Sequence, residues 1–487
     1  MFKNILYGLI SAQVISSFHV YYSNLKLYKF LAAADKAGYL IVPNHNVLPS
    51  LKTLGPAVFG GLFFTLTVGA GLSILSYFLC WLWIYLFKRD RYFLVIVLVL
   101  WAILLSLFSI QGFALFPSIY LVIIPIIVAG TTLISVPKQT QKISRLSIII
   151  HLAPIMVLSI LWFTEYDKRM FVDIRDNLLL SNKIGQSINH FYYKYTLYPA
   201  EAFKTLEQKQ IKGCYLEPLN NQALTTRLEN DLLNHDYLIL DSPVNVQLRL
   251  QVDEGNLYFF DVRKMVHLVQ INDFLRDPGK ELKTFSQKSD TNVYFRYLIS
   301  LSLLIGFPVL LYLFFYSFFA STFRFIIGPE WSGRSASLLC FVLSLLIFFS
   351  FQVNRGPKLS TDDVAQKLES GDWRQRTEAL RLIVEENLEI GKFPIYKKLL
   401  TSPHIPEKYW LAKAIGQSRS RSTTTDIISL LDDPHPNVVC IALEALGNIR
   451  DKRSISLIMQ KLKSSDHWYI EWYAYRALRS LGWKQKR

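Results

Sequence analysis

The sequence predicts a multi-pass α-helical membrane protein with six or seven spans, an inserted soluble α+β domain and a C-terminal α-solenoid. Hydrophobic residues make up 51% of the 487 positions and charged residues only 18%. Soluble domains usually carry about 25% charged residues, so this deficit indicates a membrane protein. Two groups of long apolar runs predict the spans. A short sequence motif near the C-terminus, which is repeated after 31 residues, predicts the solenoid.

The first 53 residues form a signal-anchor-like segment and a linker. Residues 5–22, "ILYGLISAQVISSFHVYY", follow Lys3 and are interrupted by serine and glutamine. No small-residue cleavage site follows promptly, which favours an uncleaved anchor over a removed signal peptide. The pattern leaves both alternatives open.

Six further apolar runs are long enough to cross a bilayer, which needs about 20 residues. Four of them form a bundle over residues 54–163, and two form a hairpin over residues 297–353. Small residues in the first run predict close packing against a helix of this chain or of a partner. The runs cover 58–87, 92–113, 115–136, 146–163, 297–319 and 335–353, and the small residues are Ala57, Gly60, Gly61, Gly69 and Gly71.

The short loops predict the orientation of the chain. "KRDR" at 88–91 and "PKQTQKISR" at 137–145 are basic, whereas "QGFALF" at 111–116 has no charge. Basic loops stay in the cytoplasm. We therefore expect a bacterial inner-membrane protein with residues 164–296 and 359–487 on the periplasmic side.

Residues 164–296 are predicted to form the soluble α+β domain, and they resemble no known family. An apolar stripe predicts one helix, and Pro199 starts a second that runs towards Gly213. "VNVQLRLQV" at 244–252 alternates as a strand, "DEGN" turns the chain and "LYFF" returns it as a hairpin. The stripe consists of Ile184, Ile188, Phe191 and Tyr195.

The C-terminal region, 359–487, repeats with a fixed period. Leu400, Leu431 and Leu462 recur every 31 residues, and "LAKAIG", "ALEALG" and "ALRSLG" close the corresponding helices. Alanine at 414 and 445 would let paired helices approach closely. The glycine that ends each of the three motifs is expected to adopt a left-handed conformation and cap its helix. Asp432, Asp433 and Pro434 are expected to cap and start the next helix. Stacked helix pairs of this kind form a solenoid.

"DDPHPNVVCIALEALGNIRDKRSISLIMQKL" resembles the short HEAT-like repeats first recognised in phycobilisome lyases. The resemblance covers about residues 362–487, with a degenerate first pair, "DWRQRTEALRLI". It departs from the common pattern at Val439, where a basic residue usually follows the valine. Such repeats occur in proteins of many functions, so the resemblance implies a protein-binding surface rather than lyase chemistry.

Two histidines and a dense aromatic run are the candidate partner-binding residues. His404 and His435 occupy equivalent turns, and His467 is one residue out of register. The histidines could form a row that binds a metal or another ligand, or they could be ordinary polar turn residues. The run at 466–483 combines aromatic and arginine side chains, which are typical of interface hot spots. It would contact a protein partner, or pack on the membrane surface or on the 164–296 domain. Its candidate residues are Trp468, Trp472, Tyr473, Arg476 and Arg479.

Several classes of function lack support in the sequence. The net charge of +16 lies largely beside apolar runs, which favours bilayer headgroups over nucleic acid. No catalytic, cofactor-binding or metal-binding motif occurs, and the span interiors lack the ionisable groups that carriers need. We therefore expect no cofactor and a membrane-anchored scaffold or accessory protein whose partners are a protein and the lipid bilayer. The alternatives are a membrane subunit of a transport or envelope-lipid system, and an enzyme hidden in 164–296.

Overall fold

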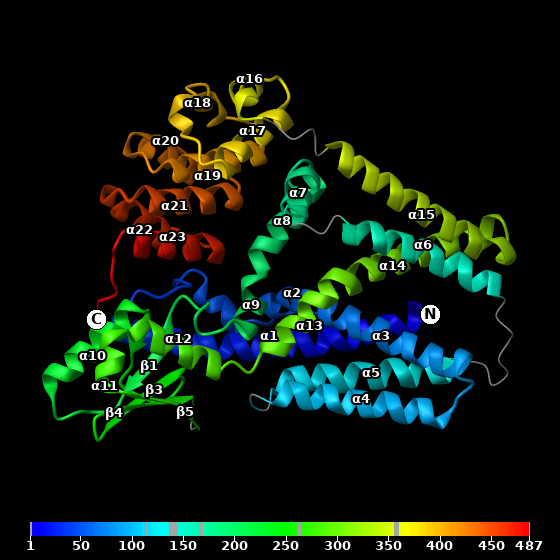
Figure 1. The fold of residues 1–487 in the computed structure, drawn as a ribbon, viewed down its shortest axis with the longest axis horizontal. Helices are drawn as coiled ribbons and strands as arrows, with labels where there is room; N and C mark the ends of the chain where they lie inside the picture. The colour runs from blue at the N-terminus through cyan, green and yellow to red at the C-terminus, as the bar shows by residue number, and fades with distance from the viewer. Residues whose placement is uncertain are drawn as a thin grey trace.

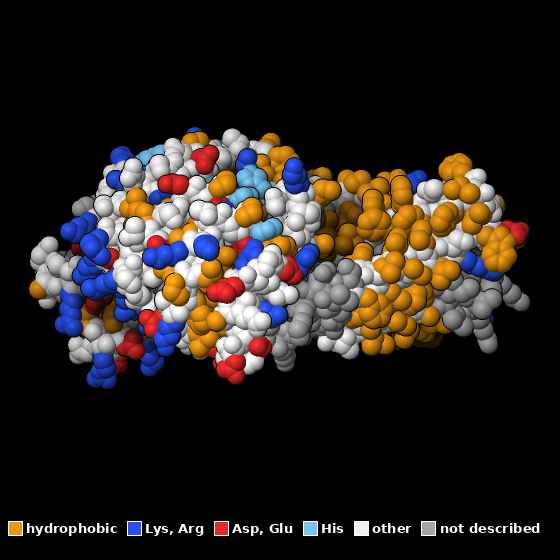
Figure 2. Space-filling view, turned by 90° about the horizontal axis from the view of Figure 1, so that it is seen from above, with side chains coloured by type: hydrophobic (Ala, Val, Ile, Leu, Met, Phe, Trp, Pro, Cys, Tyr) orange, Lys and Arg blue, Asp and Glu red, His pale blue; other side chains and the backbone are white. Residues whose placement is uncertain are grey.

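The computed structural model describes residues 2–110, 112, 114–135, 145–164, 169–261, 264–354 and 360–486. The molecule is elongated, with long helices along one half and a mixed sheet and a stack of short helices at the other (Figure 1). Hydrophobic side chains dominate the surface of the helical half, whereas charged side chains gather on the other half (Figure 2). An apolar belt beside a charged head is the surface expected of a membrane-anchored protein.

Among the described residues, five helical segments are long and apolar enough to cross a membrane. They are Leu54–Leu86, Arg91–Ser109, Leu115–Ser135, Val293–Ile326 and Pro329–Phe349. Helix α6 (Arg145–Thr164) covers the predicted run 146–163, and most of the preceding basic loop lies outside the described residues. The count of six or seven spans stays a prediction.

The N-terminal stretch is a single helix of 35 residues, α1 (Phe2–Lys36), which contacts α2, α3 and α5 of the bundle. Its buried side carries Asn4, Ser16, His19 and Asn24. Asn4 Nδ2 donates to Thr132 Oγ1 over 3.3 Å. These four polar residues of α1 therefore face the protein interior. The neighbouring elements are α2 (Leu54–Phe64), η2 (Thr65–Gly69), α3 (Ala70–Trp81), η3 (Leu82–Leu86), α4 (Arg91–Ser109) and α5 (Leu115–Ser135).

Small residues bring the bundle helices close together within this chain. A Cβ atom added at Gly69 would lie 2.5 Å from Ala12 Cβ, and one at Gly61 would lie 2.9 Å from Ser16 Oγ. Gly71 packs instead against the second group of helices, where a Cβ at Gly306 would lie 2.9 Å from Gly71 Cα. These glycines therefore pack against the same chain, which is one of the two alternatives that the sequence left open. The second group comprises α13 (Val293–Leu301), η5 (Ser302–Gly306), α14 (Phe307–Ile326) and α15 (Pro329–Asn354).

The soluble domain contains one mixed sheet of strand order β2-β1-β3-β4-β5. Strand β1 pairs in parallel with β2 and β3, and β3, β4 and β5 pair antiparallel. Helices α10, α11 and α12 bury Leu228, Phe274 and Phe285 against the sheet. The elements are β1 (Lys212–Leu216), α10 (Gln222–Asn234), β2 (Tyr237–Ile239), β3 (Leu248–Asp253), β4 (Asn256–Asp261), β5 (Lys264–Gln270), α11 (Ile271–Arg276) and α12 (Pro278–Lys288).

Two boundaries in this domain differ from the sequence-based expectation. The hairpin forms at Glu254 and Gly255, whose φ angles of 48° and 80° suit a tight turn, but its first strand begins at Leu248 instead of Val244. The helix that contains Pro199, α9 (Leu197–Phe203), ends well before Gly213, which lies in β1. A Cβ at Gly213 would lie 2.8 Å from the Phe30 ring of α1, so this glycine permits close packing rather than stopping a helix.

Four helix pairs build the C-terminal region, and their second helices α17, α19, α21 and α23 stack in order. The region begins with the turn η6 (Thr361–Asp363). Similar turns join the later helices: η7 (Ile390–Lys392), η8 (Arg421–Thr423), η9 (Leu430–Asp432) and η10 (Lys452–Ser454). The pairs are α16 (Val364–Leu368) with α17 (Trp373–Glu385), α18 (Tyr396–Leu399) with α19 (Ile405–Ser418), α20 (Thr424–Ser429) with α21 (Pro436–Ile449), and α22 (Ile455–Ser464) with α23 (Trp468–Ser480).

The predicted repeat register is present, but two of its capping details are wrong. Gly416 lies inside α19, where an added Cβ would be 2.6 Å from Ala445 Cα, so it serves helix packing. The left-handed residue that ends α19 is Arg419, with φ of 49°. Helix α21 begins at Pro436 rather than Pro434, because Asp433 Oδ1 accepts from the backbone N–H of His435 over 2.9 Å and turns the chain first.

Candidate partner-binding surface

The structure places the three repeat histidines at equivalent positions but in different surroundings. His404, His435 and His467 are the residues that precede α19, α21 and α23. The His404 ring stacks on Trp373 at 5.2 Å, and His435 Nδ1 lies 3.1 Å from Asp433 Oδ1. Burial lowers the pKa of His467 to about 4. In the part of the chain that the structure describes, no group of three or more His, Cys, Asp or Glu side chains is arranged to hold a metal ion.

Much of the aromatic run is engaged with the chain itself. The Trp468 ring packs edge-on against Tyr198 of α9 at 5.1 Å. Arg479 Nε lies 2.9 Å from Asp236 Oδ1, and Tyr475 Oη donates to the same oxygen over 2.6 Å. Trp468 and Arg479 therefore fasten the last repeat to the soluble domain. That any residue of the run binds a partner stays a prediction.

The linker after α1 forms a second attachment, which sequence reasoning missed. Asn44 donates its backbone N–H to Glu471 Oε2 over 2.6 Å. Its Nδ2 atom donates to the backbone oxygens of Leu462 over 2.7 Å and Ser465 over 2.9 Å. The "NHN" triplet that begins at Asn44 belongs to no recognisable motif. The sequence therefore does not indicate that Asn44 contacts residues more than four hundred positions away.

Charged side chains join the first two repeats to the segment that leads into the soluble domain. Arg381 of α17 lies 2.6 Å from Asp173 Oδ1, within α7 (Met170–Asp173). Trp410 Nε1 of α19 donates to Asp176 Oδ2 over 2.7 Å, within η4 (Ile174–Leu179). The Arg175 guanidinium lies 3.8 Å from the centre of the Tyr409 ring.

Helix α8 (Lys183–Tyr195) continues this contact over the later repeats. Asn189 Nδ2 donates to Asn437 Oδ1 of α21 over 2.7 Å, and both residues are buried. The Tyr193 ring lies 4.8 Å from the Tyr469 ring of α23. Elements α7, η4 and α8 therefore cover Arg381 on α17 and the N-terminal halves of α19, α21 and α23 on the face formed by the second repeat helices.

The C-terminal half of the same face is open. A groove of about 640 Å³, here named the repeat groove, extends from the loop after α17 across α19 to α21. Arg476 lies 32 positions after Glu444, which itself follows Lys413 by 31, so it extends this row onto α23. The Lys413 ammonium lies 5.0 Å from the Trp410 ring. The groove is lined by Asn387, Lys413, Gly416, Gln417, Arg419, Glu444 and Asn448.

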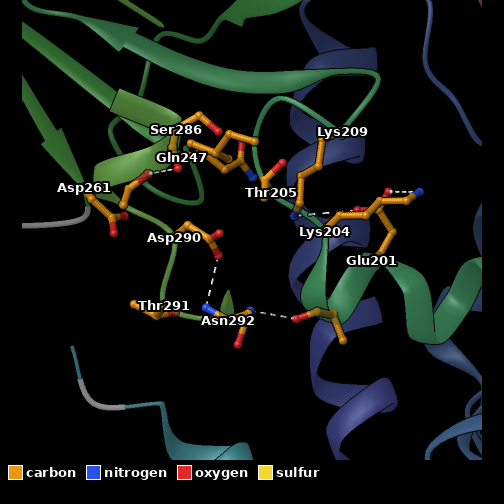
Figure 3. Close-up of a pocket in the computed structure, with 13 residues that line it drawn as sticks. Glu201, Lys204, Thr205, Lys209, Gln247, Asp261, Ser286, Asp290, Thr291 and Asn292 are labelled. Carbon is orange, nitrogen blue, oxygen red and sulfur yellow. Dashed lines mark hydrogen bonds and ion pairs between the residues drawn. The ribbon is translucent and has the colours of Figure 1, made fainter. Parts of the chain in front are cut away.

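A smaller polar cavity of about 150 Å³ lies where the soluble domain meets the bundle (Figure 3). Burial of Glu201 opposes its ionisation, but two lysines hold its pKa below the usual value. They are Lys204, 3.4 Å away, and Lys209, 3.6 Å away. Asn292 Nδ2 donates to Ala202 O over 3.3 Å across the cavity. Burial raises the pKa of Asp261. The hydrogen bond between Asn292 and Ala202 therefore links α9 to the start of α13.

Comparison with known proteins agrees with the repeat architecture. Residues 394–479 match the family model of HEAT repeats. No curated protein and no solved structure gives a significant match to the chain. The C-terminal region is thus a HEAT-repeat α-solenoid, a class of fold that generally mediates protein–protein interaction, attached to one end of an apolar helical bundle.

Proposed function

We propose that this protein is a membrane-anchored scaffold that binds a protein partner in the repeat groove. The main observation in support of this proposal is that the solenoid face is divided into a covered part and an open part. Residues of α7, η4 and α8 cover one half, and the other half is an open polar groove. The fixed half holds the repeats beside the bundle, and the open half presents their side chains to a partner.

The groove residues suggest the chemistry of that partner. Lys413 and Arg419 supply positive charge against the single negative charge of Glu444, and Arg476 on α23 adds positive charge beyond the groove. The carboxamide groups of Asn387, Gln417 and Asn448 can both donate and accept hydrogen bonds. Carboxamides on successive repeats suit the peptide groups of an extended chain. The partner would therefore present an extended segment that carries acidic side chains.

The proposal places the protein in a bacterial inner membrane with the soluble domain and the repeats in the periplasm. The turn that contains Lys88 and Arg89, the turn between α14 and α15, and the N-terminal end of α1 all lie on the half of the molecule away from the sheet and the repeats (Figure 1). Basic residues at these turns favour the cytoplasm.

The alternative, a membrane subunit of a transport or envelope-lipid system, has less support. Its substrate would pass through or bind within the bundle, where one face of α1 packs against α2, α3 and α5 and the other face, with Ile10, Val14 and Phe18, is exposed. For the enzyme alternative, Glu201 and Asp290, two of the three carboxyl groups that line the smaller cavity, are engaged in ion pairs. We therefore assign no catalytic role to the soluble domain.

Charge reversal in the groove tests this function. Lys413→Glu combined with Arg419→Glu should reduce partner capture by about tenfold or more, because like charges placed opposite an acidic segment repel it. The measurement is quantitative affinity purification from membranes, with each captured protein compared between wild type and variant. Thermal unfolding must show that the variant remains folded.

Lys397→Glu combined with Lys398→Glu is the matched control. It makes the same change of charge on the exposed side of α18, away from the groove. Capture should survive in this control. If both variants lost partner capture equally, the loss would be an effect of net charge and not of the groove. Full capture by the groove variant would contradict the proposed function.

A further inference from the structure

Helix α8 carries an apolar face that nothing in the described chain fully covers. Ile184, Ile188 and Phe191 follow one another at helical spacing, and their exposed fractions are 76%, 55% and 38%. Such a stripe normally faces a protein core, yet these side chains are open. An exposed apolar stripe on a regular helix indicates an interaction surface.

The opposite face of α8 is already occupied. Asn189 and Tyr193 contact α21 and α23 of the solenoid. With 3.6 residues per turn, these two positions lie on the opposite side of the helix from Ile184, Ile188 and Phe191. The apolar stripe therefore points away from the repeats.

The stripe is continuous with the apolar surface of the bundle. Phe59 of α2 is 44% exposed, and its ring lies 5.8 Å from the Phe191 ring and 4.9 Å from the Tyr195 ring. Leu54 and Val58, which precede Phe59 on α2, are also exposed. Because α2 begins the helix Leu54–Leu86, the surface of α8 joins the membrane-facing belt at its edge.

The direction and charge of α8 fit a bilayer surface. The helix runs across the long bundle helices rather than along them (Figure 1). Lys183 and Lys194 are exposed near its two ends, and the sequence has no acidic residue between Asp176 and Glu201. Helices with an apolar face, a polar face and flanking lysines bind in the plane of membranes that contain anionic lipids.

We propose that α8 is an interfacial helix whose stripe of Ile184, Ile188 and Phe191 inserts between the headgroups and the upper acyl chains of an anionic bilayer. This inference rests on the proposed membrane anchoring. Because the other face of α8 is fixed to α21 and α23, the helix sets how closely the solenoid and the repeat groove approach the lipid surface.

Depth-dependent quenching tests the proposal on the full-length protein in nanodiscs of anionic phospholipid. An environment-sensitive NBD fluorophore is attached at Ile188→Cys, in a background whose four native cysteines are replaced by alanine. Lipids carry a doxyl quencher either near the headgroup or near the bilayer centre. The label should lose more fluorescence to the shallow doxyl group than to the deep one.

Two control positions separate this inference from the proposed function. A label at Leu98→Cys, on the exposed side of α4, should be quenched by the deep doxyl group, and one at Asn220→Cys, in an exposed loop of the soluble domain, by neither. Quenching at 98 but not at 188 would overturn the interfacial helix and leave membrane anchoring intact. If 188 were shielded from lipid and from an aqueous quencher alike, a protein would cover the stripe, which also overturns the proposal. Absence of quenching at 98 would instead contradict the membrane anchoring itself.

Discussion

Glu471 shows how a single residue couples the repeats to the N-terminal linker. Its side chain is fully buried, and its Oε2 atom accepts from the backbone N–H of Asn44. Burial raises the pKa of Glu471 to about 8, despite the opposing effect of this hydrogen bond. The carboxyl group is therefore mainly protonated at neutral pH in the folded protein.

The sign of the pH effect follows from this raised pKa. In an unfolded chain a glutamate titrates near 4.3, so only the folded state keeps the proton between about pH 4.3 and 8. The associated stability is full below about pH 4.3 and is lost as the pH rises to about 8, with a slope of at most about 1.4 kcal/mol per pH unit.

We predict that Glu471→Gln removes this part of the pH dependence. Between about pH 5 and 8, the Tm of the wild type should fall more steeply than that of the variant, measured by thermal unfolding in detergent. Glu386→Gln, at an exposed glutamate, is the control and should follow the wild type. Parallel curves for wild type and Glu471→Gln would show that Glu471 is not protonated in the folded state.

Residue-level roles were predicted least well, because most of the partners are remote in sequence. The fixed spacing of His404 and His435 correctly indicates equivalent positions, but not that one stacks on Trp373 while the other meets Asp433. Gly416 and Gly447 follow an alanine-rich helix as a cap would, yet both lie at helix crossings. A glycine that ends a helix and one that permits a close crossing leave the same local pattern.

At the scale of elements, the apolar runs and the repeat period predicted helix positions, but not which surface each helix faces. The stripe of α8 has the spacing of a core-facing helix, and its apolar side is nevertheless exposed. The polar residues of α1 suggest a weak anchor, whereas Asn4, Ser16, His19 and Asn24 are buried against the bundle. Hydropathy measures how apolar a helix is, and it cannot distinguish lipid from protein as the neighbour.

The contact between α1 and the first long helix provides the element-scale prediction. Gly69→Leu would force a side chain into the position of Ala12, whose Cβ lies 2.5 Å from the site of the new Cβ. Overpacking of this kind typically costs about 1–3 kcal/mol. We expect a lower Tm and a lower yield of monodisperse protein in detergent.

Gly130→Leu is the matched control for that substitution. Gly130 also lies in an apolar helix, α5, but no atom of another described helix lies within 4 Å of a Cβ added there. The control should keep the Tm of the wild type. If Gly69→Leu were equally stable, α1 would not pack against this face of the helix.

At the scale of the whole molecule, the repeats identified the class of the C-terminal region and the apolar runs indicated the bundle. Their mutual arrangement could not be predicted. The ion pair between Arg381 and Asp173 and the hydrogen bond between Asn189 and Asn437 each join segments more than two hundred residues apart. No local pattern marks such pairs, and no related structure supplies them.

We expect the soluble domain and the HEAT repeats to lie together on one side of a membrane, and cysteine accessibility can measure this topology. Single cysteines at 89 and 328 probe the turns at one end of the bundle, and cysteines at 220 and 422 probe the soluble domain and the repeats. With a membrane-impermeant thiol reagent on intact cells of a cysteine-free background, 220 and 422 should label after removal of any outer-membrane barrier. Positions 89 and 328 should label only after lysis. Labelling of 220 and 422 from opposite sides, or of all four positions in intact cells, would show that this topology is wrong.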